Sequence, residues 1–246
     1  MYLEAFKDPK KFVEVAKKVV KEKPIVMIKV GVSEDGRSAI RRHTASVAED
    51  PEIVEKVMRE AGVIRVYGVD EMIDTVAALS RAPLPKGPNI AIVTNAGGLG
   101  VLSTDLIYEK GLRLAKLSDK TKEELRKYVP PFGTVENPID LTASVDREAL
   151  EKVIEITLRD DNVDCLMFTG QHSSFLPVDT FVKPCATNKK LADELGKPFM
   201  VVITGAFLQQ TTSEFIDNGF PTYPTPERAI TALANMYEYG KRISTA

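Results

Sequence analysis

Long apolar runs alternate with amphipathic stretches along the whole chain. Runs that are apolar on both faces are typical of strands buried in parallel sheets. Helical periodicity is found between them, at 8–22, 51–62, 118–129, 146–160 and 225–242. The apolar runs of strand length are Pro24 to Gly31, Asn89 to Gly98, Val163 to Gly170 and Pro198 to Gly205. This alternation predicts an α/β fold built on parallel sheets.

A stretch rich in proline and glycine, "RAPLPKGPN" at 81–89, interrupts the alternation. Such composition is typical of a linker, because proline and glycine favour turns over helices and strands. We therefore expect a first domain over 1–82, a linker over 83–88 and a second domain over 89–246.

The two parts of the chain repeat each other. "EKPIVMIKVG" at 22–31 resembles "GKPFMVVITG" at 196–205, and 61–79 resembles 218–236 in the same order. The second copy has an earlier part, at about 89–161, that has no counterpart in the first. We expect two flavodoxin-like parallel-sheet domains, of which the first is incomplete and lacks about two strands. Another chain or an upstream segment would have to cover its open sheet edge.

Composition narrows the functional classes. The 246 residues are 43% hydrophobic and 28% charged, with a formal net charge of −2, so no global field favours nucleic acid or an anionic membrane. The apolar runs are shorter than the roughly 18 residues of a membrane span. Cys165 and Cys185 have neither metal-type spacing nor a disulfide framework, which favours a reducing cytoplasm. The absence of Trp and the high Lys and Glu content hint at a thermophile.

A glycine-rich turn follows the apolar run that begins at Asn89. In "VTNAGGLG" the strand pattern ends, and Asn95, Gly97 and Gly98 precede a helical stripe. The free N–H groups of a helix N-terminus can bind phosphate, and glycine allows close approach. The sequence is not a P-loop, and its glycine spacing differs from that of dinucleotide-binding turns. A tight turn that needs glycine only for packing is an equally good interpretation.

Small polar residues follow the next predicted strand, in "TGQHSSFLPVDT" at 169–180. The carboxyl ends of parallel strands line the ligand crevice, so Gly170, Ser173 and Ser174 are candidate phosphate-binding residues. His172 could contact an anion there. The alternative is an ordinary surface histidine, and we favour that alternative over a role in covalent catalysis.

The segment "ENPIDLTAS" at 136–144 supplies another group of candidate ligand contacts. Asn137 precedes a proline and is expected in a turn. Asp140 could accept hydrogen bonds from a ligand, with Thr142 beside it. Asp140 could equally cap the helix that includes Ala149.

His43 follows a glycine-containing polar stretch that we interpret as a loop, with Arg37, Arg41 and Arg42 before it. A neutral imidazole is a competent nucleophile toward a phosphoryl group. A carboxylate on its other ring nitrogen would orient it, and the arginines could screen phosphate charge. The alternative is a solvated histidine in a basic loop, which these residues alone favour.

Motifs along nearly the whole chain resemble the ADP-forming acetyl/acyl-CoA synthetases, relatives of succinyl-CoA synthetase. They occur in family order as "YLE", "KPIVMIKVG" with "HTASVA", "AGVIRV", "PLPKGPNIAIVTNAGGLGVLSTD", "ENPIDLT" and "NVDCLMF". The resemblance implies an acid–thiol ligase that interconverts acyl-CoA, ADP and phosphate with acid, CoA and ATP. In that family a histidine in an S-H-T-G-like loop carries the phosphoryl group and swings between two sites. His43 matches that histidine, and Glu4 of "YLE" matches the glutamate that supports it.

The resemblance also implies cofactors and partners. CoA, ATP or ADP, and Mg²⁺ would take part, with nucleotide and metal bound mainly by a partner. The chain would act with a CoA-binding domain or upstream segment and an ATP-grasp subunit, in a hetero- or homo-oligomer in the cytoplasm.

The chain departs from the family motif around His43. Arg42 and Ala45 give R-H-T-A in place of S-H-T-G, and Glu49 stands where glycine is usual. Alanine would stiffen the loop, and Glu49 would add negative charge near a bound phosphate. Two other functional classes therefore stay open: a non-catalytic CoA-ligase-like regulatory or scaffold domain, and a stand-alone flavodoxin-like ligand-binding module.

Overall fold

The structure is a computed structural model that describes residues 1–44, 46–143, 145–174 and 176–244. It divides into two compact units. Unit 1 comprises Met1–Val76 together with the chain from Glu238 onward, and unit 2 comprises Ala77–Tyr237. The domain limits at 82 and 89 stay predictions. The sequence did not indicate that the chain returns to unit 1 at Glu238.

Unit 1 contains a parallel sheet with the strand order β1-β2-β3. Leu3 lies opposite Lys29, and Ile28 lies opposite Val66. Helix α1 begins with Asp8, whose side chain accepts a hydrogen bond from the Lys11 backbone N–H. The elements that begin in this unit are β1 (Tyr2–Leu3), α1 (Pro9–Val19), β2 (Val26–Lys29), α2 (Glu34–Thr44), α3 (Pro51–Ala61), β3 (Ile64–Val66) and α4 (Val69–Arg81).

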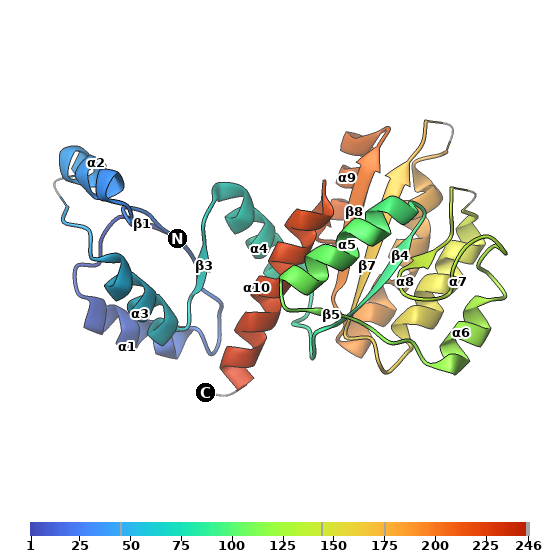
Figure 1. The fold of residues 1–246 in the computed structure, drawn as a ribbon, viewed down its shortest axis with the longest axis horizontal. Helices are drawn as coiled ribbons and strands as arrows, with labels where there is room; N and C mark the ends of the chain where they lie inside the picture. Colours follow the sequence, from blue (N-terminus) through green and yellow to red (C-terminus); the bar gives the residue numbers. More distant parts are fainter. Residues whose placement is uncertain (45, 144, 175, 245–246) are drawn as a thin grey trace. The chain divides into compact units, whose positions relative to one another are not determined.

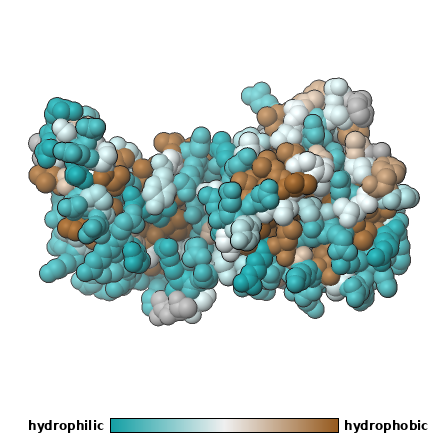
Figure 2. All heavy atoms as spheres, in the orientation of Figure 1, coloured by the Kyte–Doolittle hydropathy of each residue, from teal (hydrophilic) through white to brown (hydrophobic). Residues whose placement is uncertain are grey.

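Helix α2 replaces the loop that we expected before His43. Its acidic residues lie in the first turn and its basic residues in the last turn, which complements the helix dipole. Ile40 is the buried residue of this helix, and it packs against Gly31, which has a φ of 75°. A helix that buries a single apolar side chain has no apolar stripe, so the pattern did not reveal it. Its surface is predominantly hydrophilic (Figure 2).

Unit 2 contains a six-stranded parallel sheet whose main order is β5-β4-β7-β8-β9, with β6 paired to the carboxyl end of β4. The predicted parallel α/β fold is therefore confirmed. The elements are β4 (Asn89–Thr94), α5 (Gly97–Glu109), β5 (Arg113–Leu114), α6 (Asp119–Leu125), β6 (Ile139–Asp140), α7 (Arg147–Leu158), β7 (Cys165–His172), α8 (Asp179–Leu195), β8 (Phe199–Gly205), α9 (Leu208–Asp217), β9 (Thr222–Tyr223) and α10 (Pro226–Ser244).

Helices cover both faces of this sheet (Figure 1). Ala91 and Val93 of β4 belong to a core shared with α6, α7, α8 and α9. Ile90 and Ile92 belong to a second core shared with α5 and α10. Successive strand residues point to opposite faces, so a strand covered on both sides must be apolar throughout. This explains the unbroken apolar runs in the sequence.

The sequence repeat has a counterpart in the strand order. The order β1-β2-β3 in unit 1 parallels β7-β8-β9 in unit 2, and in both units the last two strands of the series pair in parallel. Among the described residues of unit 1, no strands correspond to β4 and β5. The proposal that another segment completes this sheet beside β1 stays a prediction.

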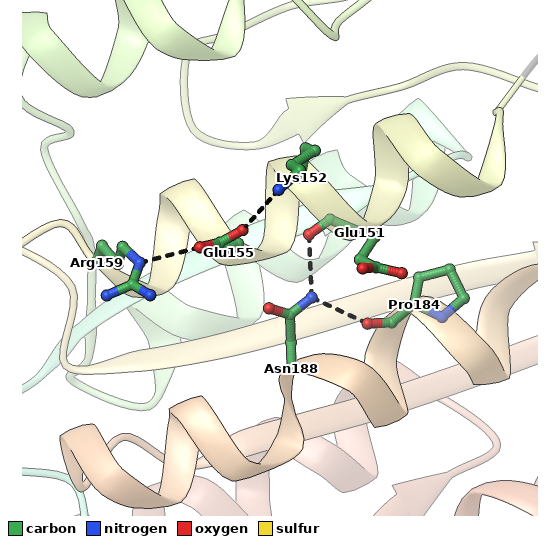
Figure 3. A network of polar contacts seen from close by, with 6 residues as sticks. All are labelled: Glu151, Lys152, Glu155, Arg159, Pro184 and Asn188. Carbon is green, nitrogen blue, oxygen red and sulfur yellow. Dashed lines mark hydrogen bonds and ion pairs between the residues drawn. The ribbon is translucent and has the colours of Figure 1, made fainter.

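Helices α7 and α8 are joined by a buried amide (Figure 3). Pro184 lies inside α8 and lacks the N–H group that a helix normally uses. One turn later, Asn188 Nδ2 donates to the Pro184 carbonyl and to the Glu151 carbonyl of α7, each at 3.0 Å. The side chain thus connects the two helix backbones directly.

Both cysteines are free and buried, and burial raises the pKa of each thiol. In the described part of the chain, no helix is both long enough and apolar enough to cross a bilayer.

Candidate functional site

His43 lies in the last turn of α2, with its side chain 78% exposed. Its Nδ1 atom is 3.5 Å from Oε1 of Glu4, which follows β1 directly. The other carboxylate oxygen of Glu4 accepts a hydrogen bond of 2.7 Å from the Thr44 hydroxyl. The structure therefore brings together the two predicted catalytic residues, and the imidazole is accessible rather than packed in the core. Ala45, where the sequence departs from the family motif, lies outside the described residues.

The pairing with Glu4 decides which ring nitrogen of His43 can react. A carboxylate beside Nδ1 favours the proton on that atom, and Nε2 then carries the lone pair. The same carboxylate would offset positive charge that develops on the ring when Nε2 forms a bond. The arrangement therefore combines an accessible imidazole with a carboxylate beside its Nδ1 atom.

Glu49, which we expected to add negative charge near a bound phosphate, is paired with a lysine. Its side chain is 12% exposed and forms an ion pair with Lys29, with 3.3 Å between Nζ and Oε2. Its Oε1 atom accepts a hydrogen bond from the Phe6 backbone N–H at 2.5 Å. That expectation stays a prediction, but it did not include Lys29, whose only sequence signal is a lysine that ends the apolar run "VMIK".

In unit 2, the turn after β4 leaves a helix N-terminus without a side-chain cap. The Thr94 hydroxyl accepts from the Ala96 N–H at 2.9 Å and donates to the Thr169 carbonyl at 2.9 Å. Ala96 occupies the N-cap position of α5, and its methyl group cannot accept a hydrogen bond from the first N–H groups of the helix. A Cβ on Gly98 would meet no atom within 4 Å, so its backbone is open to approach. Helix ends of this kind can bind anions.

Asp140 lies beside this turn and does not cap the following helix. Its Oδ2 atom is 2.7 Å from where a Cβ on Gly97 would be, and its Oδ1 atom accepts from the Thr142 N–H at 2.7 Å. Helix α7 is capped by Asp146, which accepts from the Ala149 N–H. The capping alternative for Asp140 is therefore wrong, and its carboxylate faces the glycine turn.

Asn137 is built into the sheet. Its Nδ2 atom donates to the carbonyls of Ile90 and Ala115, at 2.8 and 3.0 Å. Its Oδ1 atom accepts from the Ile92 N–H at 2.9 Å. These hydrogen bonds take the place of strand pairing along β4. The sequence predicted Asn137 only as a ligand contact and did not reveal this structural role.

Strand β7 continues past Gly170 to His172, two residues beyond the predicted strand end. A Cβ on Gly170 would lie 2.8 Å from the Phe168 ring and 2.9 Å from the Ile203 side chain. Packing between neighbouring side chains thus requires glycine at this position. The Asn95 amide clamps the end of the strand, donating to the Gln171 carbonyl at 3.0 Å and accepting from its N–H at 2.8 Å.

His172 is buried, so the expectation of an ordinary surface histidine was wrong. The residue is 2% exposed, and Nε2 lies 3.2 Å from the Pro177 carbonyl. Its ring meets the Phe181 and Phe207 rings edge-on. Nδ1 has no hydrogen-bond partner in the described part of the chain. Ser173 and Ser174 follow on the surface side, half-buried and exposed, respectively.

The predicted residues thus fall into two groups, each within one unit. Unit 1 brings His43 and Glu4 together. In unit 2, Asn137 lies before β6 and bonds along β4. The remaining candidates lie at or near the carboxyl ends of β4, β6 and β7, and they are Asn95, Gly97, Gly98, Asp140, Thr142, Gly170, His172, Ser173 and Ser174. The described residues contain no group of three or more His, Cys, Asp or Glu side chains arranged to hold a metal.

Family models match most of the chain. A model described as "Succinyl-CoA ligase like flavodoxin domain" matches residues 1–79, and one described as "Ligase-CoA domain" matches residues 90–245. Among curated relatives, the alpha subunit of acetate–CoA ligase [ADP-forming] II of Pyrococcus furiosus is 37% identical over 99% of this chain and 53% of its own length. Acetate–CoA ligase [ADP-forming] of Methanocaldococcus jannaschii is 33% identical over 97% of this chain and 34% of its own length.

A solved structure is also similar throughout. The Ca. Korarchaeum cryptofilum dinucleotide forming acetyl-coenzyme A synthetase 1, in complex with phosphate and ADP, matches with a TM-score of 0.91 and 31% identity. The match covers 99% of this chain and 53% of that one. The chain therefore spans about half the length of the alpha subunit and of the solved chain that it matches.

Proposed function

The chain belongs to the Ligase-CoA domain family, and on that premise we propose that it is part of an ADP-forming acyl-CoA synthetase. This acid–thiol ligase interconverts acyl-CoA, ADP and phosphate with acid, CoA and ATP. The observation that carries the proposal is the exposed His43 imidazole, 3.5 Å from the Glu4 carboxylate, in a chain similar over 99% of its length to an ADP-forming acetate–CoA ligase subunit.

His43 would carry the phosphoryl group between two half-reactions. Phosphate attacks the thioester carbonyl, the C–S bond breaks, and an acyl phosphate forms while CoA departs as a thiol with the proton that phosphate gives up. Nε2 of His43 then attacks phosphorus, and the bond to the acyl oxygen breaks to release the acid as its carboxylate. The ring keeps its Nδ1 proton, and the Glu4 carboxylate offsets the positive charge. A terminal oxygen of ADP finally attacks phosphorus, which gives ATP and restores the neutral imidazole.

The glycine turn in unit 2 is the proposed contact for the travelling phosphoryl group. The uncapped N-terminus of α5 offers backbone N–H groups, and Gly98 leaves room for an anion to approach them. Asn95 and Gly97 shape this turn, and the end of β7 would add Gly170, Ser173 and Ser174. The Asp140 carboxylate lies beside Gly97, so the backbone N–H groups must outweigh the repulsion of this negative charge when an anion binds at the turn.

Other polypeptide segments would complete the enzyme. We propose a CoA-binding domain or upstream segment and an ATP-grasp subunit that holds the nucleotide and its Mg²⁺, assembled as an oligomer. The length of the curated alpha subunit, about twice that of the matched segment, supports this proposal. A reducing cytoplasm suits the two free, buried thiols, and the thermophile assignment remains a sequence prediction.

Labelling with [γ-³²P]ATP and Mg²⁺ tests the proposal in the chain assembled with its CoA-binding and ATP-grasp partners. We expect an acid-labile, alkali-stable label on this chain, which is the stability pattern of a phosphohistidine. The chain has two histidines, so peptide mapping places the label on His43 or on His172. His43→Asn should abolish the label, and Glu4→Gln should slow its formation by about 10- to 100-fold, as for other groups that orient a functional histidine.

Glu14→Gln is the matched control for the Glu4 variant. Glu14 is an exposed carboxylate of α1 that pairs with Lys18 within the same helix. Its loss should leave labelling unchanged. Absence of label in the competent wild-type assembly, or label on another residue, would refute the carrier role of His43 and favour a regulatory or scaffold function.

A further inference from the structure

Lys29 places a positive charge inside unit 1. Its side chain is fully buried at the end of β2, and its Nζ atom has acceptors on several sides. It donates to the backbone carbonyls of Glu4 and Val30, at 2.7 and 2.8 Å. Oε2 of Glu49 lies 3.3 Å away with the geometry of an ion pair. The ammonium group therefore donates two hydrogen bonds to backbone carbonyls and meets the Glu49 carboxylate at ion-pair distance.

Both members of the ion pair form hydrogen bonds with the backbone of the chain segment that carries Glu4. Lys29 holds the carbonyl of Glu4, while Glu49 accepts a hydrogen bond from the N–H of Phe6, two residues further on. The Phe6 ring lies over the ammonium group, 5.9 Å from its centroid. Both charges are largely withdrawn from water, so neither can leave its partner without a large desolvation cost.

The segment held in this way determines where the Glu4 carboxylate lies. That carboxylate accepts from the Thr44 hydroxyl and faces Nδ1 of His43. We infer that Lys29 and Glu49 are positioning residues, which fix Glu4 so that it keeps the His43 proton on Nδ1 and leaves Nε2 as the nucleophile. The consequence for phosphoryl transfer rests on the proposed function, whereas the choice of tautomer does not.

The tautomer can be measured directly by ¹⁵N NMR of the imidazole rings in the full chain. Only two histidines contribute signals, and the spectrum of His43→Asn assigns them. In the wild type at a pH where the ring is neutral, the shifts of His43 should report a proton on Nδ1. In Lys29→Met, the shifts should move toward the Nε2–H form, because the group that faces Nδ1 sets the tautomer and the Glu4 carboxylate would no longer be held there.

A double variant separates positioning from stability. Lys29→Met alone leaves Glu49 as an unpaired buried charge and should lower the thermal midpoint. Lys29→Met/Glu49→Gln removes both charges and should recover much of that midpoint. The hold on the Glu4 carbonyl is still absent, so the tautomer should remain shifted. Recovery of the wild-type tautomer in the double variant would overturn the inference.

Arg65→Met is the matched control in the same unit. Arg65 lies on β3, its side chain is 12% exposed, and it forms an ion pair with Glu55. Its loss should also lower the thermal midpoint, with the His43 shifts unchanged. A tautomer change of the same size in this variant would show that general destabilisation is the cause.

Phosphoryl transfer provides the second readout. In the assembled ligase, the rate of His43 labelling should fall about 10- to 100-fold in the double variant, with the nucleotide KM unchanged. If wild-type His43 is not labelled but the tautomer responds as described, the proposed function fails and the positioning role stands. If His43 is labelled but Lys29→Met and the double variant both retain the Nδ1–H form, the positioning role fails alone.

Discussion

Gly97 and Gly98 are adjacent in the sequence but have different surroundings. A side chain at Gly97 would collide with the Asp140 carboxylate, whereas one at Gly98 would enter open space. The first glycine accommodates the Asp140 side chain of another chain segment. The second has no such neighbour, and its lack of a side chain leaves the backbone at the N-terminus of α5 open.

These surroundings predict opposite stability effects for two alanine substitutions. Gly97→Ala should reduce the free energy of unfolding by about 0.5–1.5 kcal/mol, the usual net loss for one hydrogen bond, because the methyl group would push the Asp140 carboxylate away from the Thr142 N–H. Gly98→Ala should leave it unchanged or raise it by about 0.4–1 kcal/mol, because alanine restricts the unfolded chain. Urea unfolding of the full chain measures both. Equal losses in the two variants would contradict the assignment of Asp140 beside Gly97.

Chemistry-bearing residues could be predicted from the sequence where a motif marks them, but not their surroundings. His43 and Glu4 were identified through the family motifs, although the two residues lie 39 positions apart in the sequence. The Lys29–Glu49 pair was missed because charged residues are normally exposed, and no local pattern shows that a lysine at a strand end is buried. His172 was misjudged for the same reason, since the aromatic rings around it come from other elements.

At the scale of elements, hydrophobic patterning predicted the strands that are covered on both faces and the helices α1, α3, α6, α7 and α10 close to their observed positions. It did not predict α8, although that helix is extensively buried. Helix α2 was not predicted either, since it buries little and owes its stability to charges placed along its dipole. Two-residue strands such as β5 and β6 are likewise defined by their neighbours rather than by their own sequence.

The contact between α7 and α8 should depend on Asn188. Asn188→Ala removes two hydrogen bonds from a buried amide to helix carbonyls, so the free energy of unfolding should fall by about 1–3 kcal/mol. Thr187→Ala is the control, because that exposed hydroxyl bonds only to Lys183 among the contacts described and its loss should cost less than about 0.5 kcal/mol. Chemical denaturation distinguishes these outcomes, and similar losses would argue against the bridging role.

At the scale of the whole molecule, Asp160 should make stability depend on acid pH. Burial raises the pKa of this carboxyl, but hydrogen bonds from Thr121, Ser118 and Asn162 outweigh it and hold the pKa below its usual range. Between the lowered value and the ordinary one, the unfolded chain binds more protons, so stability rises with pH. The contribution is complete above about pH 5 and is lost as the pH falls through the lowered pKa.

Asp160→Asn tests this dependence. The variant should be less stable than the wild type at pH 7, and the difference should shrink progressively below about pH 4. Glu194→Gln, which alters an exposed carboxylate of α8, should differ little from the wild type at every pH. Thermal unfolding from pH 7 to pH 2 supplies the comparison. A difference for Asp160→Asn that is independent of pH would show that its stabilising role is not tied to ionisation.

The internal repeat gave the best sequence-based view of the whole molecule. It predicted two related parallel-sheet parts, and the matching orders β1-β2-β3 and β7-β8-β9 follow it. The path of α10 could not be predicted in this way. Its residues up to Tyr237 belong to unit 2 and those from Glu238 to unit 1, and nothing in a continuous amphipathic helix marks that division.

The position of His43 in the final turn of α2 has a consequence for a phosphorylated imidazole. That end of a helix is the negative pole of its dipole, where arginines and a protonated imidazole stabilise the helix and a dianionic phosphate destabilises it. Attaching phosphate would therefore repel the carrier from its own helix terminus and loosen the last turn. Discharge would let the turn re-form. On the proposed function, phosphorylation of His43 would itself release the imidazole from the end of α2, without a further signal.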